Sequence, residues 1–100
     1  MDRELKQWLF SQASYYLEYL QPRKGIVLLE AIRRLEPGNP DVHRMLSYAY
    51  LKVERPEESI KSADKFMQYV KPGTDVRAIK WIKGRALLNR KKQAAASEMR

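Results

Sequence analysis

The chain lacks cysteine altogether among its 100 residues. This absence excludes a disulfide framework and any thiolate metal site, and it fits a reducing compartment, so we expect a cytoplasmic protein. There is only one histidine, His43, which leaves a transition metal almost without ligands. We therefore expect no cofactor. Because His43 falls in the first turn of a predicted helix, we interpret it as a packing residue and not a catalytic one.

Long apolar runs are missing too. The densest run, Ile26-Val27-Leu28-Leu29, is far shorter than the roughly 20 residues of a membrane span. The charged residues 1–6 lead directly into helical periodicity, so we expect no secretory signal and a soluble protein. No Gly-rich phosphate loop, no Ser/His/Asp order and no paired carboxylates stand out, so the sequence does not predict an enzyme.

The net charge of +8 is concentrated at the C-terminal end. Residues 77–100 hold eight Lys and Arg against the single acid Glu98, a net of +7, which leaves only +1 for residues 1–76. This basic end could attract an acidic protein, nucleic acid or anionic lipid, because a surface potential does not name its partner. A solvated terminal helix explains it equally well.

Prolines and Pro-Gly pairs fall only between segments of helical periodicity, which predicts five helices. Proline suits the first position of a helix, and Asn39 can cap the third one. The predicted spans are about 3–20, 22–36, 40–53, from Pro56 to Pro72-Gly73, and from a cap at Thr74 or Asp75 to about 92. Residues 94–100 have no apolar stripe to dock them, so we expect them to fray.

The apolar positions predict which helix faces are buried. In the first helix one stripe comprises Leu5, Leu9, Ala13, Tyr16 and Leu20, spaced three or four residues apart. The second helix is apolar around most of its circumference, so we expect it to be buried between neighbours. Trp8 is expected to pack, and Tyr15 and Tyr19 to form an exposed edge or a self-association surface.

Helix endings recur along the chain. Pro37 and Pro72 lie 35 residues apart, and each is followed by glycine and a capped helix. Self-similarity at this period predicts a helical array. Registers starting at Lys6 and Pro40 resemble the tetratricopeptide signature, with small residues where two helices must approach closely: Ala13 and Gly25 in the first repeat, and Ser47 and Ser59 in the second. Gln12 and Ile32 depart from the signature.

A third register starts at Arg77 and places Gly84 at the equivalent small position, but too few residues remain for a second helix. The resemblance therefore implies an all-α, right-handed superhelix of about five antiparallel helices, with a single domain over 1–93, repeats at about 6–39 and 40–73, and a capping helix at about 75–92. A generic helical bundle with coincidental prolines is the alternative.

In arrays of this kind the first helix of each repeat lines a concave side. The rings of Phe10, Tyr48 and Trp81 lie off the core stripes, and leaving three rings in water is costly, so a partner helix is expected to cover them. The alternative is that they fold back into the core or a dimer contact. The register predicts a partner-binding groove formed by Phe10, Ser14, Leu17, Arg44, Tyr48, Leu51, Lys52, Trp81, Arg85 and Leu88, and it also places Glu18 on this side.

Over roughly residues 5–93 the chain resembles the small type III secretion chaperones, and in particular the Y-type chaperones of X-type early export components. The resemblance rests on Trp8-Leu9 opening the first helix, on the segment from Ile26 that ends in Leu35-Glu36-Pro37, and on the shortened last repeat. It implies a cytoplasmic heterodimer in which the groove shields a client helix until export, without chemistry or ATP.

Two other functions remain open at this stage. Heat-shock co-chaperone repeats clamp a terminal carboxylate with Lys and Asn, but Phe10, Ser14 and Met45 occupy three of those positions, which disfavours that function. A nucleic-acid or anionic-surface binder would use the basic C-terminal helix, although we consider nucleic acid the less favoured partner.

Overall fold

The structure, a computed structural model, describes residues 2–19 and 21–99, and the regular structure in those ranges is helical throughout. All five predicted helices are confirmed, with ends that differ by a few residues. They are α1 (Arg3–Tyr19), α2 (Pro22–Leu35), α3 (Pro40–Lys52), α4 (Pro56–Tyr69) and α5 (Arg77–Glu98). Leu20, expected in the first apolar stripe, lies outside the described residues.

Local chemistry accounts for the helix starts. Proline occupies the first turn of α2, α3 and α4, where its missing N–H costs no hydrogen bond. The Asn39 side chain accepts a hydrogen bond from the Asp41 N–H at 2.9 Å, as the predicted cap should. Before α5 the residue in the cap position is Val76, which has no side-chain hydrogen bond to the helix, but the preceding Asp75 accepts from the Arg77 N–H through its Oδ1 at 3.0 Å.

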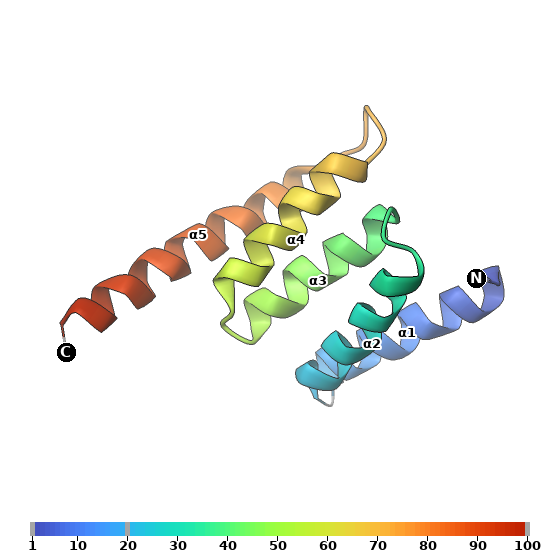
Figure 1. Cartoon of the computed structure of the whole chain (residues 1–100), viewed down its shortest axis with the longest axis horizontal. Coiled ribbons are helices and arrows are strands. Elements are labelled where there is room, and N and C mark those ends of the chain that lie inside the picture. Colours follow the sequence, from blue (N-terminus) through green and yellow to red (C-terminus); the bar gives the residue numbers. More distant parts are fainter. Residues whose placement is uncertain (1, 20, 100) are drawn as a thin grey trace.

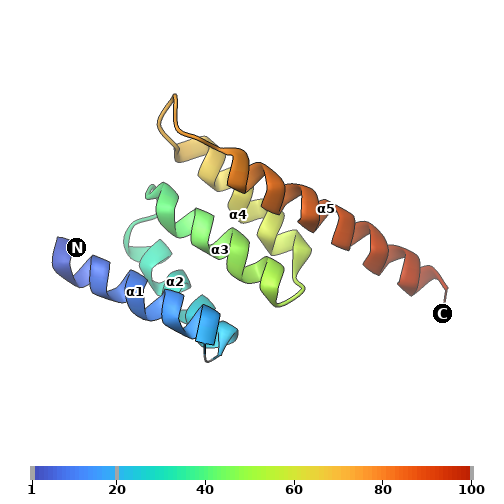
Figure 2. The same ribbon diagram turned by 180° about the vertical axis from the view of Figure 1, so that it is seen from behind.

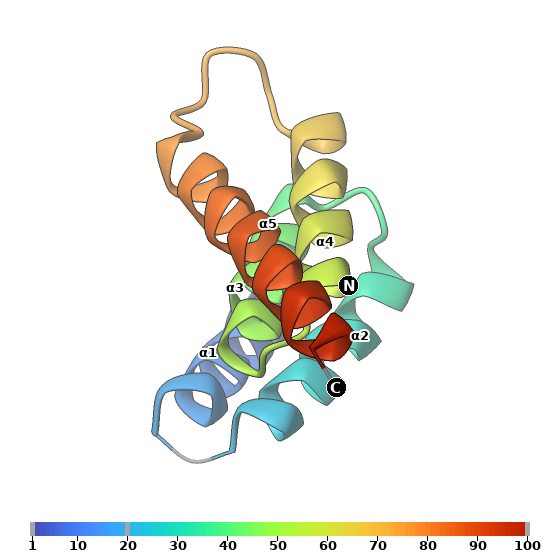
Figure 3. The same cartoon turned by 90° about the vertical axis from the view of Figure 1, so that its left-hand side faces the viewer.

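The helices form two layers. In Figure 2, α1, α3 and α5 pass in front, and α2 and α4 lie behind them. Figure 1 shows the opposite side, and Figure 3 shows the layers edge-on. α1 pairs with α2 and α3 with α4, α2 also contacts α3, and α5 packs against both α4 and α3. Each helix is thus held mainly by its neighbours along the chain.

Small residues set the separation within each pair. A Cβ added at Gly25 of α2 would lie 2.9 Å from the Leu17 side chain and 3.0 Å from the Ala13 carbonyl oxygen of α1. Between α3 and α4, the Ser47 hydroxyl donates to the Ser59 carbonyl at 2.9 Å, and the Ser59 hydroxyl donates to the Ser47 carbonyl at 2.7 Å. Both contacts join the residue pairs that the register placed opposite each other.

The core consists of two clusters that meet at α3. The first combines α1, α2 and α3, and its fully buried members include Ala13, Leu29, Val42, Leu46 and Ala49. The second combines α4 and α5 around Ala63, Phe66, Ile79 and Ile82, with Tyr48 and Leu51 of α3 packed against it. Because α3 contributes to both clusters, it couples the two halves of the molecule.

Several apolar residues expected inside are on the surface. Leu5 is 49% exposed and Trp8 58%, because no helix of the described chain covers that side of α1. In α2, Val27 and Leu35 are 69% and 67% exposed, so the prediction that this helix is buried all round was wrong. Within the described chain α2 packs mainly against α1 and α3, and the side that carries Val27 and Leu35 meets solvent.

The C-terminal residues also differ from expectation. α5 continues to Glu98, where we expected residues 94–100 to fray. The Arg90 guanidinium lies 3.5 Å from the Glu57 carboxylate, and the Gln93 amide donates to the Glu54 carbonyl at 3.1 Å, so α5 remains attached as far as the start of α4. Beyond Gln93 the alanines have high helix propensity and extend the helix into solvent.

A polar network lies between α2, α3 and α4, on the side away from α5. The Tyr50 hydroxyl donates to Glu30 Oε1 at 2.9 Å, and the Arg55 guanidinium lies 5.2 Å from the centre of the Tyr50 ring. Burial and the hydrogen bond to Glu30 raise the pKa of Tyr50 to about 12. Nearby, His43 Nε2 is 2.7 Å from the Pro37 carbonyl oxygen and its ring stacks on Tyr69, consistent with a packing role.

The two helical glycines provide a matched test of close packing. We expect Gly25→Ala to destabilise the protein by about 1–3 kcal/mol, because the new methyl group clashes with α1. Gly84→Ala, with nothing within 4 Å, should stabilise it by about 0.5–1 kcal/mol through helix propensity alone. Urea unfolding followed by circular dichroism measures both. Stabilisation by both substitutions would contradict the close contact between α1 and α2.

The Tyr50 hydroxyl gives a pH-dependent contribution to stability. Its pKa is raised from 10.0 to about 12 by folding, so the folded state retains this proton more tightly than the unfolded chain. The contribution is therefore complete below pH 10 and is lost as the pH rises to 12. We expect Tyr50→Phe to cost about 1–2 kcal/mol at neutral pH, and this deficit to shrink between pH 10 and 12 in urea titrations. A constant deficit would contradict the buried hydrogen bond.

Candidate functional site: a groove across α1, α3 and α5

A cavity of about 510 Å³ opens between the three helices of one layer. It is lined by Ser14, Leu17 and Glu18 of α1, by Arg44, Met45 and Tyr48 of α3, and by Ala78, Trp81 and Ile82 of α5. On each helix the lining residues are one, three or four positions apart, so they share one face. We call this cavity the groove.

Five of the ten predicted groove residues line it: Ser14, Leu17, Arg44, Tyr48 and Trp81. Glu18, which the register also placed on this side, lines it too, whereas Met45, Ala78 and Ile82 were missed. Met45 and Ile82 each directly follow a predicted lining residue, and a helix face about 100° wide includes such neighbours. Ile82 belongs to both the second core cluster and the cavity wall.

The floor of the groove is apolar and continuous with the core. Leu17 is only 4% exposed and belongs to the first core cluster, which corrects the expectation that it lies off the core stripe. The reason is Gly25, whose missing side chain leaves room for Leu17 between α1 and α2. Ile82, at 9% exposed, forms the corresponding part of the floor on α5.

Trp81 stands at the α5 edge of the groove. Trp81 is 63% exposed although its ring is large and mostly apolar. The Arg85 guanidinium lies 5.9 Å from the centre of this ring. The stacked arginine holds the ring from the next turn of the helix and supplies a cation beside it. Trp81 thus presents a large exposed ring next to an apolar cavity.

Polar contacts connect α1 and α3 across the rim of the groove. The Tyr48 hydroxyl donates to Glu18 Oε1 at 2.9 Å, and Lys52 Nζ lies 3.8 Å from Glu18 Oε2. Lys52 also sits over the Tyr48 ring, 5.3 Å from its centre. These contacts join α1 and α3 at this end. They also give Glu18, the acidic residue of the groove lining, two partners.

The other five predicted residues do not line the cavity. Leu51 packs against the second core cluster, and Lys52 and Arg85 contact the lining residues Glu18 and Trp81. Leu88 is 41% exposed and lies two turns beyond Trp81 on α5. Phe10 packs against the first core cluster and lines two other hollows instead. Tyr48 packs against the second cluster, so of the three rings expected in water two fold back onto the core and Trp81 alone is largely exposed.

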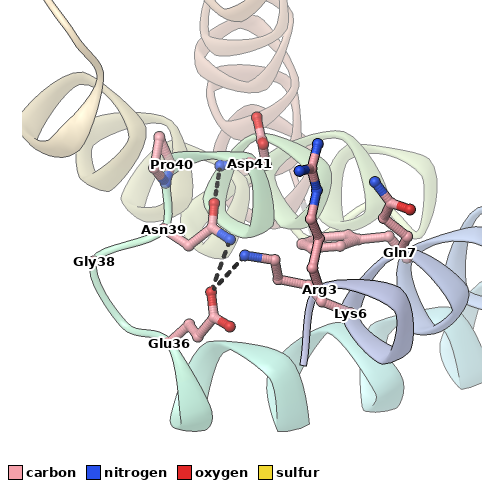
Figure 4. Close-up of a pocket in the computed structure, with 9 residues that line it drawn as sticks. Arg3, Lys6, Gln7, Glu36, Gly38, Asn39, Pro40 and Asp41 are labelled. Atoms are coloured by element: carbon pink, nitrogen blue, oxygen red, sulfur yellow. Dashed lines mark hydrogen bonds and ion pairs between the residues drawn. The ribbon is translucent and has the colours of Figure 1, made fainter. Parts of the chain in front are cut away.

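The larger hollow, of about 770 Å³, lies at the start of α1 and α3 and is shown in Figure 4. Lys6 Nζ and the Asn39 side-chain amide both donate to Glu36 Oε1, at 3.3 and 3.2 Å. Burial would raise the pKa of Glu36, but the hydrogen bonds from Asn39 and Lys6 outweigh it and hold this pKa below its ordinary value. Lys6, Glu36 and Asn39 thereby connect α1 with the end of α2 and the start of α3.

The contact across the rim can be tested with a double-mutant cycle. Because Tyr48 and Glu18 are joined by a hydrogen bond, we expect the destabilisations of Tyr48→Phe and Glu18→Ala to be non-additive by about 0.5–1 kcal/mol. The control pairs Glu18→Ala with Tyr50→Phe, since Tyr50 bonds Glu30 elsewhere. Urea unfolding gives both coupling energies. Additive effects in the first cycle would show that α1 and α3 are not joined here in solution.

The chemistry available in the groove is that of apolar contact with a polar rim. Within residues 2–19 and 21–99, no three His, Cys, Asp or Glu side chains gather closely enough to hold a metal ion. Nor does that part of the chain include a helix with the length and apolar character needed to cross a membrane.

Comparison of the chain with models of protein families, with curated proteins and with solved structures finds no match.

Proposed function

We propose that this protein binds a helical segment of another polypeptide in the groove between α1, α3 and α5. The observation that carries the proposal is the apolar cavity of about 510 Å³ with Trp81 standing exposed at its edge. Its volume lies within the roughly 300–1,000 Å³ of typical ligand sites. An amphipathic helix laid in such a groove inserts apolar side chains from successive turns.

The helix arrangement supports a tetratricopeptide-type superhelix as the scaffold. Two helical hairpins follow each other, their first helices share a layer with α5, and each hairpin is closed by the small residues that the signature requires. At the third equivalent position, Gly84 of α5 has open space around it. Open space at this glycine is expected if α5 is the first helix of a third repeat whose second helix is missing, which is the capping role expected of α5.

The resemblance to small type III secretion chaperones gives the proposal its biological form. On this account the client is an exported component of the secretion apparatus, bound as a heterodimer in the cytoplasm. The groove supports the shielding part of this role, because an apolar floor continuous with the core can cover an aggregation-prone helix without any reaction.

The basic C-terminal helix is a weaker basis for a function. Lys83 lies 2.6 Å from Asp64 and Arg90 3.5 Å from Glu57, so two of its cations already pair with acids of α4. Arg77 pairs with Asp75 in the same way. Binding of nucleic acid through the remaining charges would weaken steeply between low and moderate salt, whereas apolar groove binding should persist.

The test compares two exposed tryptophans. A tagged full-length chain is used to capture proteins from the native host at moderate salt, and partners are identified by mass spectrometry. We expect Trp81→Ala to lose the partner, because it removes the ring at the groove edge. Trp8→Ala, equally exposed but outside the groove, should keep it.

We expect circular dichroism to show that both variants retain their helix content, since both rings are on the surface. A partner retained by Trp81→Ala would contradict groove binding. So would a partner whose capture disappears at moderate salt or after nuclease treatment.

A further inference from the structure

The outer side of α1 carries a second apolar surface, distinct from the groove. It consists of Leu5, Trp8, Gln12, Tyr15 and Tyr19, whose spacing alternates between three and four residues. We call these five residues the α1 stripe. Their spacing places them on one face of α1, in the pattern that forms the seam between two packed helices. Leu5, Trp8, Tyr15 and Tyr19 are 49%, 58%, 52% and 75% exposed.

The equivalent face of α3 is a packing interface. With the repeats aligned at Lys6 and Pro40, the last four members of the stripe correspond to Val42, Leu46, Ala49 and Val53 of α3. Val42, Leu46 and Ala49 are fully buried in the first core cluster, against residues of α1 and α2, and Val53 packs against it. On α3 this face therefore attaches one hairpin to the preceding one. On α1 the same face has no hairpin before it within the described chain.

The two ends of the helix stack differ in chemistry. The outer face of α5 carries Lys80, Gly84, Leu87 and Lys91, all exposed, so its one large apolar side chain lies between two cations, and charge of this kind keeps the end of a helix stack in water. The α1 end instead shows three aromatic rings and a leucine without any charge among them. Exposed apolar patches of this kind mark interaction sites.

We propose that the α1 stripe is the interface between two copies of this chain, which pack their α1 helices antiparallel about a twofold axis at Gln12. The stripe is self-complementary in this arrangement. Gln12 meets its own counterpart, Trp8 lies opposite Tyr15 of the second copy, and Leu5 lies opposite its Tyr19. A twofold dimer of this kind uses the same patch on both subunits.

Charge favours a second copy as the occupant. No member of the stripe is ionisable at neutral pH, so two copies meet there without like-charge repulsion. Two copies that met through the basic α5 end would face each other's Lys80 and Lys91. The central Gln12 offers both a donor and an acceptor, which lets two identical amides pair across the axis.

The interface is small and leaves the groove accessible. An aromatic side chain buries about 150–250 Å² when fully covered, so the stripe contributes roughly 400–500 Å² per copy, the size of a weak and reversible interface. Ser14, Leu17 and Glu18 project from a different face of α1, so dimerisation and groove binding are compatible. The dimer should accordingly dissociate on dilution.

Sedimentation equilibrium over a range of concentrations tests the dimer. We expect the purified chain to dimerise as its concentration rises, and Trp8→Ser with Tyr15→Ser to weaken the association at least tenfold. Trp81→Ser, an equally exposed ring in the groove, is the matched control and should leave it unchanged. Circular dichroism verifies that each variant remains folded.

Single cysteines test the geometry, since the natural chain has none. Under mild oxidation Gln12→Cys should form disulfide-linked dimers rapidly. Tyr19→Cys should not link to itself, because its two copies would lie about 21 Å apart along the helix axes, but it should link to Leu5→Cys when the two variants are mixed.

Three results would overturn the proposal: a monomer at all concentrations, a dimer unaffected by the serine substitutions, or equal self-linking of all three cysteine variants. Association of the stripe with a different protein only would also overturn it. None of these results bears on the groove, whose test depends on Trp81.

Discussion

The fold depends on close approach between the two helices of each hairpin. In the first hairpin it is made possible by Gly25, which has no room for a methyl group against α1. In the second, Ser47 and Ser59 exchange hydrogen bonds between each other's hydroxyl and carbonyl groups while fully buried. Larger residues at these positions would push the helices apart and disrupt both core clusters.

This constraint also shapes the groove. Leu17 fits beneath the cavity because Gly25 leaves space for it, and α3 is held in place by core contacts on both sides. The helices α1, α3 and α5 then present Ser14, Tyr48 and Trp81 around the groove without filling it. Close packing within the hairpins and an open surface between their first helices are thus two aspects of one arrangement.

Much of this could be predicted from the sequence because the signals are local. Pro40 with the Asn39 cap, and the apolar spacing of three and four residues, indicate where helices begin and which faces are apolar. The repeat register also predicted that Ala13 lies opposite Gly25 and Ser47 opposite Ser59. Half of the predicted groove residues line the cavity, because they follow from helix faces alone.

The rest depended on information that periodicity does not contain. An apolar face predicts burial only if another element covers it, and nothing in the described chain covers Trp8, Val27 or Leu35. Leu17 was missed as a core residue because its burial depends on a glycine in another helix. Likewise, the extension of α5 to Glu98 reflects alanine propensity without any packing partner.

The most direct measurement of the central claim is a crystal structure of the protein with its bound partner. The account predicts a helix of the partner lying along α1, α3 and α5, with an apolar side chain in the cavity beside Trp81 and Tyr48. A partner bound to the outer surface of α2 and α4, with the cavity left open, would contradict it.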